Sequence, residues 1–425
     1  MIPLLAFACM SAEPKAQNWD WTAIIGTGQS LATGGGGFPI KSTTQPFRNL
    51  KLDTGDMQWP INDEDEKLSV VPLTEPVGRN PKGYPSSWPT NIDAETVHSS
   101  AGNQITALVE KAFGRDYVTV HVNVAEAGQG MVRIRKDSVR EGVSGRAYEA
   151  SLVATRAMAR LARKAGKTFG VGAIFMTHGE TDTGNAKYEE ELLQLWSDYN
   201  KDLKAITGQK QDVLMIVSQH NRLGEFSPST IAQWKIGVNN PKTIVCSGPK
   251  YQYPYTPFDQ LHMVTDSYRL LGEKYAQVYF ERVVKGRNWR PLEPISLRRK
   301  GSEVSIKFQV PVKPLVWDST LGQPHVSSPE WKNGKGFEVM DKDGKRVEIK
   351  SAEIRGKDTV VLTLAQDPGP GARVSYAMMG EPTLRNPRYG ATPHWGLLRD
   401  SDPFVGYSTQ QAQPNFCVAF DMKLS

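Results

Sequence analysis

The chain has 425 residues, of which 39% are hydrophobic and 23% are charged. This length exceeds that of one ordinary domain and allows a large buried core, so two domains are expected. The formal net charge of +6 is spread over 51 basic and 45 acidic residues without a long Lys/Arg block, which argues against a nucleic-acid partner. After the first residues there is no apolar run of about 18 residues, so no membrane span is predicted.

The chain starts with an apolar segment over residues 1–12 that is typical of the apolar half of a secretory signal, although it lacks a basic n-region. We therefore predict a signal remnant over residues 1–18 and a secreted or periplasmic location. Cys9, Cys246 and Cys417 are far apart and have no CxxC spacing, so neither a zinc site nor a disulfide framework is indicated. A single bridge between Cys246 and Cys417 stays open.

Residues 20–285 alternate short apolar runs with helical patterns, which predicts a parallel sheet flanked by helices. Strands are expected over residues 21–26, 117–124, 170–176, 213–218 and 243–247. Helices are expected over residues 103–113, 146–165, 187–207 and 266–284. An insertion over residues 41–96 has many Pro, Asp, Gly and Trp residues and little periodicity, which is usual for a functional loop. Its Trp59 and Trp88 either stack on sugar rings or pin the loop.

After residue 290 the pattern changes to strand-like alternation, as in residues 304–308 and 360–364, with turn signals such as Asp343-Gly344. This change predicts a C-terminal all-β, sandwich-like domain over residues 295–425, following an α/β domain over residues 19–290.

The first predicted strand ends in a glycine turn, Gly26-Thr27-Gly28, followed by Gln29 and Ser30. A serine presented in this way is a candidate nucleophile, but its hydroxyl needs a base within reach and the base needs an orienting acid. Asp259 and His262 lie three positions apart just before a predicted helix and can meet these two needs. We therefore predict that His262 takes the Ser30 proton and that Asp259 orients His262.

Ester hydrolysis also needs donors that face the developing oxyanion. The candidates are the backbone N–H of Ser30, the turn at Gly128 and the segment over residues 176–182. All three follow predicted strands, and open α/β sheets bind ligands at the carboxyl ends of their strands. The sequence therefore predicts that these segments meet at one site.

Four segments resemble the four blocks of the SGNH (GDSL-like) hydrolases: Gly28-Gln29-Ser30, the turn at Gly128, Gly179-Glu180-Thr181-Asp182 and Asp259-x-x-His262. The closest subgroup contains sialic acid O-acetylesterases and related carbohydrate acetylesterases. This resemblance covers about residues 20–285. It implies a flavodoxin-like three-layer α/β/α fold, no cofactor, and hydrolysis of O-acetyl esters on a carbohydrate through an acyl-enzyme on Ser30.

The same resemblance implies that Gln29 and Glu180 support the site. His178 stands where the subgroup usually has glutamine, so it can replace the amide donor only in a tautomer whose N–H points inward. The first block continues with Leu31-Ala32 instead of the more usual Asn. Residues 295–400 resemble the C-terminal β-domain of sialate O-acetylesterases only faintly.

The same residues are open to other functions. Glu180 and Asp182 could act as a glycosidase pair, although Ser30 and His262 would then have no task. His178, Glu180 and Asp182 lack a further suitable ligand, so no metal is predicted. The glycine-rich stretch over residues 26–37 suggests nucleotide binding. However, it has neither the Gly-Lys-Ser/Thr of a phosphate loop nor the third glycine of a dinucleotide fingerprint. A catalytically inactive carbohydrate-binding protein remains the alternative from another class.

Overall fold

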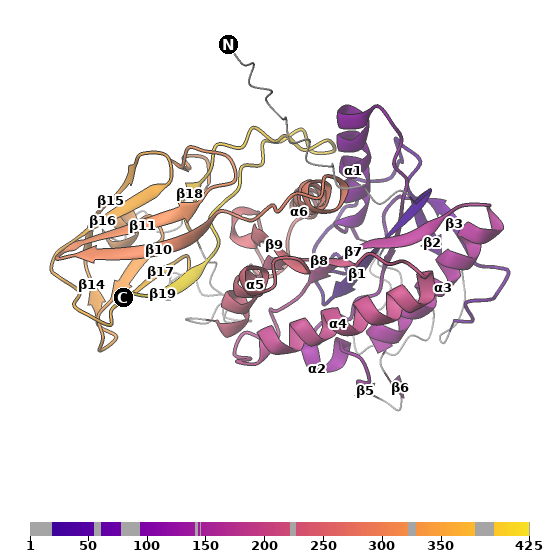
Figure 1. The fold of residues 1–425 in the computed structure, drawn as a ribbon, viewed down its shortest axis with the longest axis horizontal. Coiled ribbons are helices and arrows are strands. Elements are labelled where there is room, and N and C mark those ends of the chain that lie inside the picture. The colour runs from indigo at the N-terminus through magenta and orange to yellow at the C-terminus, as the bar shows by residue number, and fades with distance from the viewer. Residues whose placement is uncertain are drawn as a thin grey trace, which may run out of the picture.

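A computed structural model describes residues 19–54, 61–77, 94–140, 143–144, 146–221, 227–321, 329–378 and 395–424. The predicted signal remnant, Trp59 and Trp88 lie outside these residues. Figure 1 shows an α/β part beside a C-terminal β-rich part. None of the helices in the described ranges is long and apolar enough to cross a membrane.

The α/β part is built on a mixed seven-stranded sheet in the order β3-β2-β4-β1-β7-β8-β9. Its parallel strands are β1 (Trp21–Gly28), β2 (Leu50–Asp53), β4 (Thr119–Asn123), β7 (Phe169–Thr177), β8 (Leu214–Gln219) and β9 (Ile244–Pro249). β3 (Ser69–Pro72) pairs antiparallel with β2 at one edge. Counted along the chain, β4, β1, β7, β8 and β9 have the flavodoxin-like order 2-1-3-4-5. The predicted parallel sheet is therefore confirmed, and β2 and β3 show that part of the insertion extends it.

Helices cover both faces of this sheet (Figure 1). Neighbouring residues of a strand point to opposite faces, so Ile24 packs with α1 (His98–Phe113) and α6 (Thr265–Tyr279), whereas Ile25 packs on the other face. That second face carries α3 (Arg146–Lys164), α4 (Tyr188–Thr207) and α5 (Pro228–Asn239). Burial on both faces explains why the strands read as continuous apolar runs.

Short elements connect these helices and strands. They are α2 (Met131–Ile134), β5 (Val139–Arg140), β6 (Val143–Ser144), the 3-10 turn η1 (Lys250–Gln252) and the π-helical turn η2 (Phe280–Val284). η2 continues directly from α6, so the helix predicted to end at residue 284 changes its hydrogen-bonding pattern after Tyr279.

The described residues of the C-terminal part form two four-stranded antiparallel sheets and a two-stranded one. The first sheet joins β10 (Glu293–Lys300), β11 (Glu303–Gln309), β16 (Thr359–Leu364) and β15 (Ile349–Arg355). The second joins β14 (Arg346–Val347), β13 (Phe337–Met340), β17 (Arg373–Tyr376) and β19 (Phe420–Lys423), and the third joins β12 (Val316–Trp317) and β18 (Leu398–Arg399). A short helix, α7 (Pro329–Gly334), corrects the all-β expectation. The predicted alternation is observed in β11, where Val304, Ile306 and Phe308 are buried.

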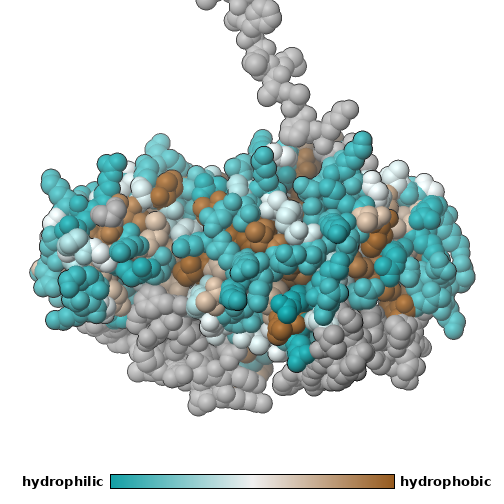
Figure 2. All heavy atoms as spheres, turned by 60° about the horizontal axis from the view of Figure 1, so that its bottom comes forward, coloured by the Kyte–Doolittle hydropathy of each residue, from teal (hydrophilic) through white to brown (hydrophobic). Residues whose placement is uncertain are grey.

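Buried polar contacts join the two parts of the molecule. The side chain of Gln219, at the end of β8, pairs with both backbone groups of Ala419 at 2.8 Å each. The Tyr251 hydroxyl donates to the carbonyl of Cys417 at 2.6 Å. Cys417 and Cys246 are both buried free thiols, so the bridge between them that the sequence left open does not form. One apolar cluster runs through both parts, and Figure 2 shows a face on which apolar groups lie scattered among hydrophilic residues.

Candidate active site

The turn after β1 presents Ser30 at the carboxyl edge of the sheet. Gly28 has φ +139°, and a Cβ there would lie 2.0 Å from the carbonyl oxygen of Thr177 at the end of β7. Only glycine fits this close approach. The carbonyl of Gln29 then accepts hydrogen bonds from the backbone N–H groups of Ala32 and Thr33, which closes the turn around Ser30. The site lies between β1 and β7, where the strand order reverses direction.

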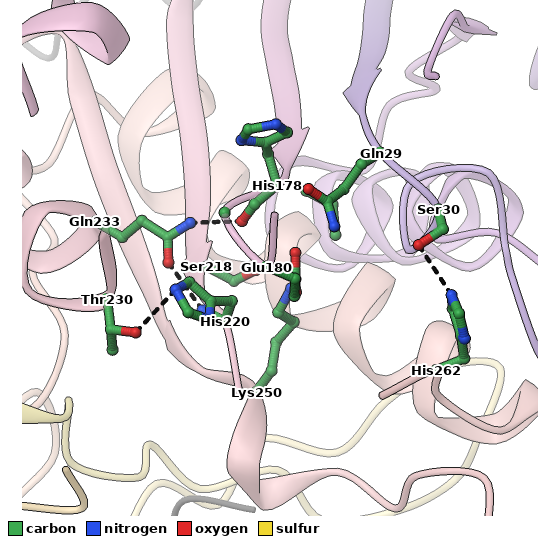
Figure 3. A network of polar contacts seen from close by, with 12 residues as sticks. Gln29, Ser30, His178, Glu180, Ser218, His220, Thr230, Gln233, Lys250 and His262 are labelled. Carbon is green, nitrogen blue, oxygen red and sulfur yellow. Dashed lines mark hydrogen bonds and ion pairs between the residues drawn. The ribbon is translucent and has the colours of Figure 1, made fainter. Parts of the chain in front are cut away.

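The structure brings together the three residues that the sequence predicts as nucleophile, base and acid. The Ser30 Oγ lies 2.9 Å from Nε2 of His262, and Figure 3 shows these side chains facing each other. On the other side of the ring, Nδ1 of His262 lies 2.6 Å from Oδ2 of Asp259. A carboxylate only accepts, so Nδ1 carries the hydrogen and Nε2 is left to accept the Ser30 proton.

Asp259 is held as a carboxylate in a buried position. Its Oδ1 accepts from Thr256 Oγ1 at 2.5 Å and from the backbone N–H groups of Leu261 and His262 at 3.0 Å each. Burial alone would raise the pKa of Asp259, but the hydrogen bonds from His262, Thr256 and the backbone outweigh it and lower this pKa well below its usual range. The acid therefore stays ionised beside the imidazole at neutral pH.

The glycine run after Ser30 packs against the imidazole of His262. A Cβ on Gly35 would lie 2.8 Å from Cδ2 of His262, and one on Gly36, which has φ +84°, would lie 2.9 Å from its Cβ. The hydroxyl of Tyr268 donates to the carbonyl of Gly35 at 2.5 Å and fixes the run. The run therefore makes room for the base.

Two backbone N–H groups are placed as candidate oxyanion donors. The N–H of Glu126 donates to the carbonyl of Gly28 at 3.0 Å, which holds the loop after β4 beside the end of β1. In this loop Gly128 is exposed and has φ +72°. Among the hydrogen bonds within the described residues, neither the N–H of Gly128 nor that of Ser30 acts as a donor. Both groups are therefore available to a ligand.

The structure does not support His178 as a third oxyanion donor. Its side chain is buried, and Figure 3 shows the ring turned away from Ser30. Its Nε2 lies 3.0 Å from the carbonyl oxygen of Gln129 and its Nδ1 lies 2.9 Å from the hydroxyl of Tyr188. Because both ring nitrogens have protein partners, the N–H that the sequence assigned to the oxyanion is already used. Burial lowers the pKa of His178, which keeps the ring neutral.

Glu180 is 1% exposed and forms an ion pair with the equally buried Lys250. Burial alone would raise the pKa of Glu180, but the Lys250 ammonium lowers it and keeps the pair charged. Figure 3 shows both side chains pointing toward one another below Gln29. The backbone N–H of Thr181 lies 3.4 Å from Oε1 of Gln29, so Gln29 and Glu180 hold the ends of β1, β7 and β9 together.

These contacts argue against a glycosidase pair. Glu180 is ionised, so it lacks the proton that a general acid must supply, and it is enclosed by protein. Oδ2 of Asp182 accepts from the backbone N–H of Met131 at 2.7 Å, which ties this carboxylate to the loop that follows Gly128. The two carboxylates thus connect the loops around Ser30. In the described ranges, no group of three or more His, Cys, Asp or Glu residues is arranged to hold a metal ion.

Sequence reasoning missed two residues that shape this site, Lys250 and Thr256. Lys250 directly follows a buried strand at the same edge of the sheet as Ser30, and this position was the only available signal. Thr256 lies three residues before Asp259, close enough for a side-chain hydrogen bond, but such spacing is common in loops. His220 forms hydrogen bonds with the hydroxyls of Ser229 and Thr230.

The fold and the geometry define an α/β protein with a Ser-His-Asp arrangement at the carboxyl edge of its sheet. No family model and no curated protein sequence matches the chain. Among solved structures, it is similar to XAC1771, a carbohydrate acetylesterase from Xanthomonas citri, with a TM-score of 0.55 and 15% identity over 94% of this chain and 80% of that one. This likeness confirms, at the level of the fold, the predicted resemblance to carbohydrate acetylesterases.

Two further solved structures are similar over a smaller share of this chain. A protein from Arabidopsis thaliana has a TM-score of 0.46 and 16% identity over 63% of this chain and 100% of that chain. NanS has a TM-score of 0.43 and 13% identity over 61% of this chain and 96% of that chain.

Proposed function

We propose that this protein is a serine esterase of the SGNH type that removes O-acetyl groups from a carbohydrate. The observation that carries the proposal is the chain of contacts from Ser30 Oγ to His262 Nε2, at 2.9 Å, and from His262 Nδ1 to Asp259 Oδ2, at 2.6 Å. This is the arrangement by which an imidazole activates a serine hydroxyl and an ionised acid fixes the imidazole tautomer. The fold shared with XAC1771 supports the choice of an acetylated carbohydrate as substrate.

The reaction follows from these contacts. Ser30 Oγ attacks the acetyl carbonyl carbon while its proton passes to His262 Nε2, and the oxyanion accepts from the N–H groups of Ser30 and Gly128. Collapse breaks the bond to the sugar oxygen, which takes the proton from His262 and leaves an acetyl ester on Ser30. Water then attacks the carbonyl carbon of this ester while one of its protons passes to His262. Collapse breaks the bond to Ser30 Oγ, which takes that proton back, and acetic acid leaves and ionises to acetate. Asp259 stabilises the imidazolium in both steps.

The hydrolase unit would occupy residues 19–290 in a three-layer flavodoxin-like arrangement, with a C-terminal β-sandwich-like unit over residues 295–425. Secretion or export to the periplasm, suggested by the apolar start, would place the enzyme where acetylated polysaccharides occur.

The test compares Ser30→Ala with Ser302→Ala, an exposed serine in a turn of the C-terminal part. Acetate release from an aryl acetate and from acetylated oligosaccharides should fall to background in Ser30→Ala and stay at the wild-type rate in Ser302→Ala. An organophosphonate should label the wild type on Ser30 covalently. Retained turnover by folded Ser30→Ala protein would contradict the mechanism, and a labelled enzyme that releases no acetate from any glycan would contradict the substrate class.

A further inference from the structure

A large cavity lies between the segment that carries the acid and base and the C-terminal part. It has a volume of about 1180 Å³. On one side it is lined by Tyr255, Thr256 and Gln260, and on the other by residues that include Trp395 and Phe416. Small-molecule sites usually measure about 300 to 1000 Å³, so this cavity has room for more than one sugar unit.

The cavity adjoins the proposed catalytic residues but does not contain the nucleophile. Thr256 lines it and also donates to Asp259 at 2.5 Å, and Gln260 directly follows that acid. Asn221, which comes just after β8, places the cavity at the carboxyl edge of the sheet. Neither Ser30 nor His262 belongs to the lining. A ligand there would lie on the Asp259 side of the His262 ring, whereas Ser30 lies on the other side of this ring.

The described lining combines aromatic rings with hydroxyl and amide groups. Trp395 and Tyr255 are partly exposed, so each can offer a ring surface to a ligand, and Gln260 and Gln411 add amide donors and acceptors. Sugars present apolar C–H faces and a rim of hydroxyl groups, which such rings and amides can contact together. This lining therefore suits a carbohydrate better than an apolar ligand.

The charges of the described lining argue against an acidic sugar. The acidic residues are Asp266, Asp318 and Asp402, and the basic residue is Arg399. Nε of Arg399 lies 2.7 Å from Oδ2 of Asp318, so its charge is already paired. Asp266 is likewise paired, with Lys41 at 2.6 Å and with Arg269 at 3.1 Å. A uronate or sialate carboxylate would therefore find no unpaired cation in the described lining.

We propose that this cavity binds the neutral sugar units that flank the acetylated unit of an oligosaccharide or polysaccharide. The inference rests on the proposed function, because it places these units next to an acetyl ester bound at Ser30. It assigns the C-terminal part a role in substrate binding and selects neutral glycan chains over free sialic acid and over polyuronates.

The experiment measures binding without turnover. Ser30→Ala protein is titrated by calorimetry with cellotetraose, mannotetraose and xylotetraose, and with tetragalacturonate as the acidic probe of equal length. At least one neutral tetrasaccharide should bind, and tetragalacturonate should bind more weakly or not at all. Failure of every neutral probe to bind, or tighter binding of tetragalacturonate, would overturn the proposal. Because Ser30→Ala cannot form an acyl-enzyme, the result does not depend on whether the wild type is an esterase.

Two substitutions in the lining and one control substitution outside it locate the binding site. Ala412 is exposed and lines the cavity, so Ala412→Trp should fill part of it and weaken neutral-tetrasaccharide binding at least about tenfold. Ala365→Trp makes the same change at an exposed position of the C-terminal part that does not line the cavity, and should bind like its parent. Trp395→Ala should weaken binding by up to about tenfold through loss of ring stacking. Equal affinities in all these proteins would overturn the assignment of the site.

Discussion

The Nε2 atom of His178 lies 3.0 Å from the carbonyl oxygen of Gln129, the residue that follows Gly128. A carbonyl only accepts, so Nε2 carries the hydrogen and Nδ1 accepts from the Tyr188 hydroxyl at 2.9 Å. Oδ2 of Asp182 holds the next part of the same loop through the N–H of Met131. We infer that His178 positions the loop that contains Gly128 through its hydrogen bond to the Gln129 carbonyl.

We therefore expect His178→Leu to lower kcat for an aryl acetate about tenfold to 100-fold with little change in KM, because the donor of Gly128 acts mainly on the transition state. His178→Gln keeps an N–H that can reach the Gln129 carbonyl and should recover most of the rate. Steady-state kinetics of the two variants provide the measurement. If His178→Gln and His178→Leu lower kcat equally, the hydrogen bond from His178 to Gln129 has no part in catalysis.

Asp259→Asn should lower kcat by roughly 10³- to 10⁴-fold, as loss of the orienting carboxylate does in other Ser-His-Asp sites. The asparagine amide can donate to Nδ1 of His262, which leaves the hydrogen on Nε2 and removes the base from Ser30. The measurement is the single-turnover rate of Ser30 acylation by an aryl acetate. Asp367→Asn, an exposed aspartate of the C-terminal part, is the matched control and should acylate at the wild-type rate.

The lowered pKa of Asp259 also predicts how this residue contributes to stability as the pH changes. Its folded-state pKa lies below the ordinary value of 3.8, so the folded state favours the ionised form. The contribution is fully present above the unfolded-state pKa and is lost as the pH falls through the folded-state pKa. The difference in free energy of unfolding between wild type and Asp259→Asn should therefore be largest near neutral pH and shrink below about pH 4. Chemical denaturation at several pH values measures it, and a difference that grows on acidification would contradict the prediction.

The buried pair of Glu180 and Lys250 should show strong coupling. Lys250→Met leaves a buried carboxylate without its cation and should cost about 3–5 kcal/mol of unfolding free energy, and Glu180→Gln should be similarly harmful. The double variant should be less destabilised than the sum of both, because it buries no unpaired charge. The exposed pair Lys342 and Asp343 is the control, for which Lys342→Ala should cost less than about 1 kcal/mol. Additive effects of the buried pair would contradict this view.

Regular periodicity made most of the α/β fold predictable. The apolar runs located β1, β4, β7, β8 and β9 within a few residues, because each strand is buried on both faces. α5 was missed although Ser227 caps it, by accepting from the N–H of Thr230, and Pro228 occupies its first turn. β2 and β3 were missed because they are short strands at one side of the sheet whose residues are partly buried or exposed, which leaves no clear alternation in the sequence.

The candidate site was likewise predictable only in part. Residues at the ends of predicted strands could be placed at one edge of the sheet, which located Ser30 and the turn at Gly128. Asp259 and His262 were paired with Ser30 by their spacing just before a predicted helix, and the structure brings these three residues together. The direction of a side chain could not be predicted in this way. His178 leaves the correct strand end but turns toward Tyr188, since the nearby loop offers its ring a carbonyl and a hydroxyl. The contact between Glu180 and Lys250 joins segments 70 residues apart, and nothing local in the sequence specifies it.

Gln219 allows a test of how firmly the C-terminal part is attached to the sheet that carries the site. Its side chain donates to the carbonyl of Ala419 and accepts from the Ala419 N–H, both at 2.8 Å, and it also donates to the carbonyl of Thr230 at 2.9 Å. Gln219→Met keeps the length of the side chain but leaves these buried backbone groups unsatisfied, which should cost about 2–4 kcal/mol of unfolding free energy. Faster hydrogen exchange at the Ala419 amide should accompany the loss. Gln309→Met, at a partly exposed position of β11, should change neither quantity, and unchanged exchange at Ala419 in Gln219→Met would show that other contacts attach the C-terminal part.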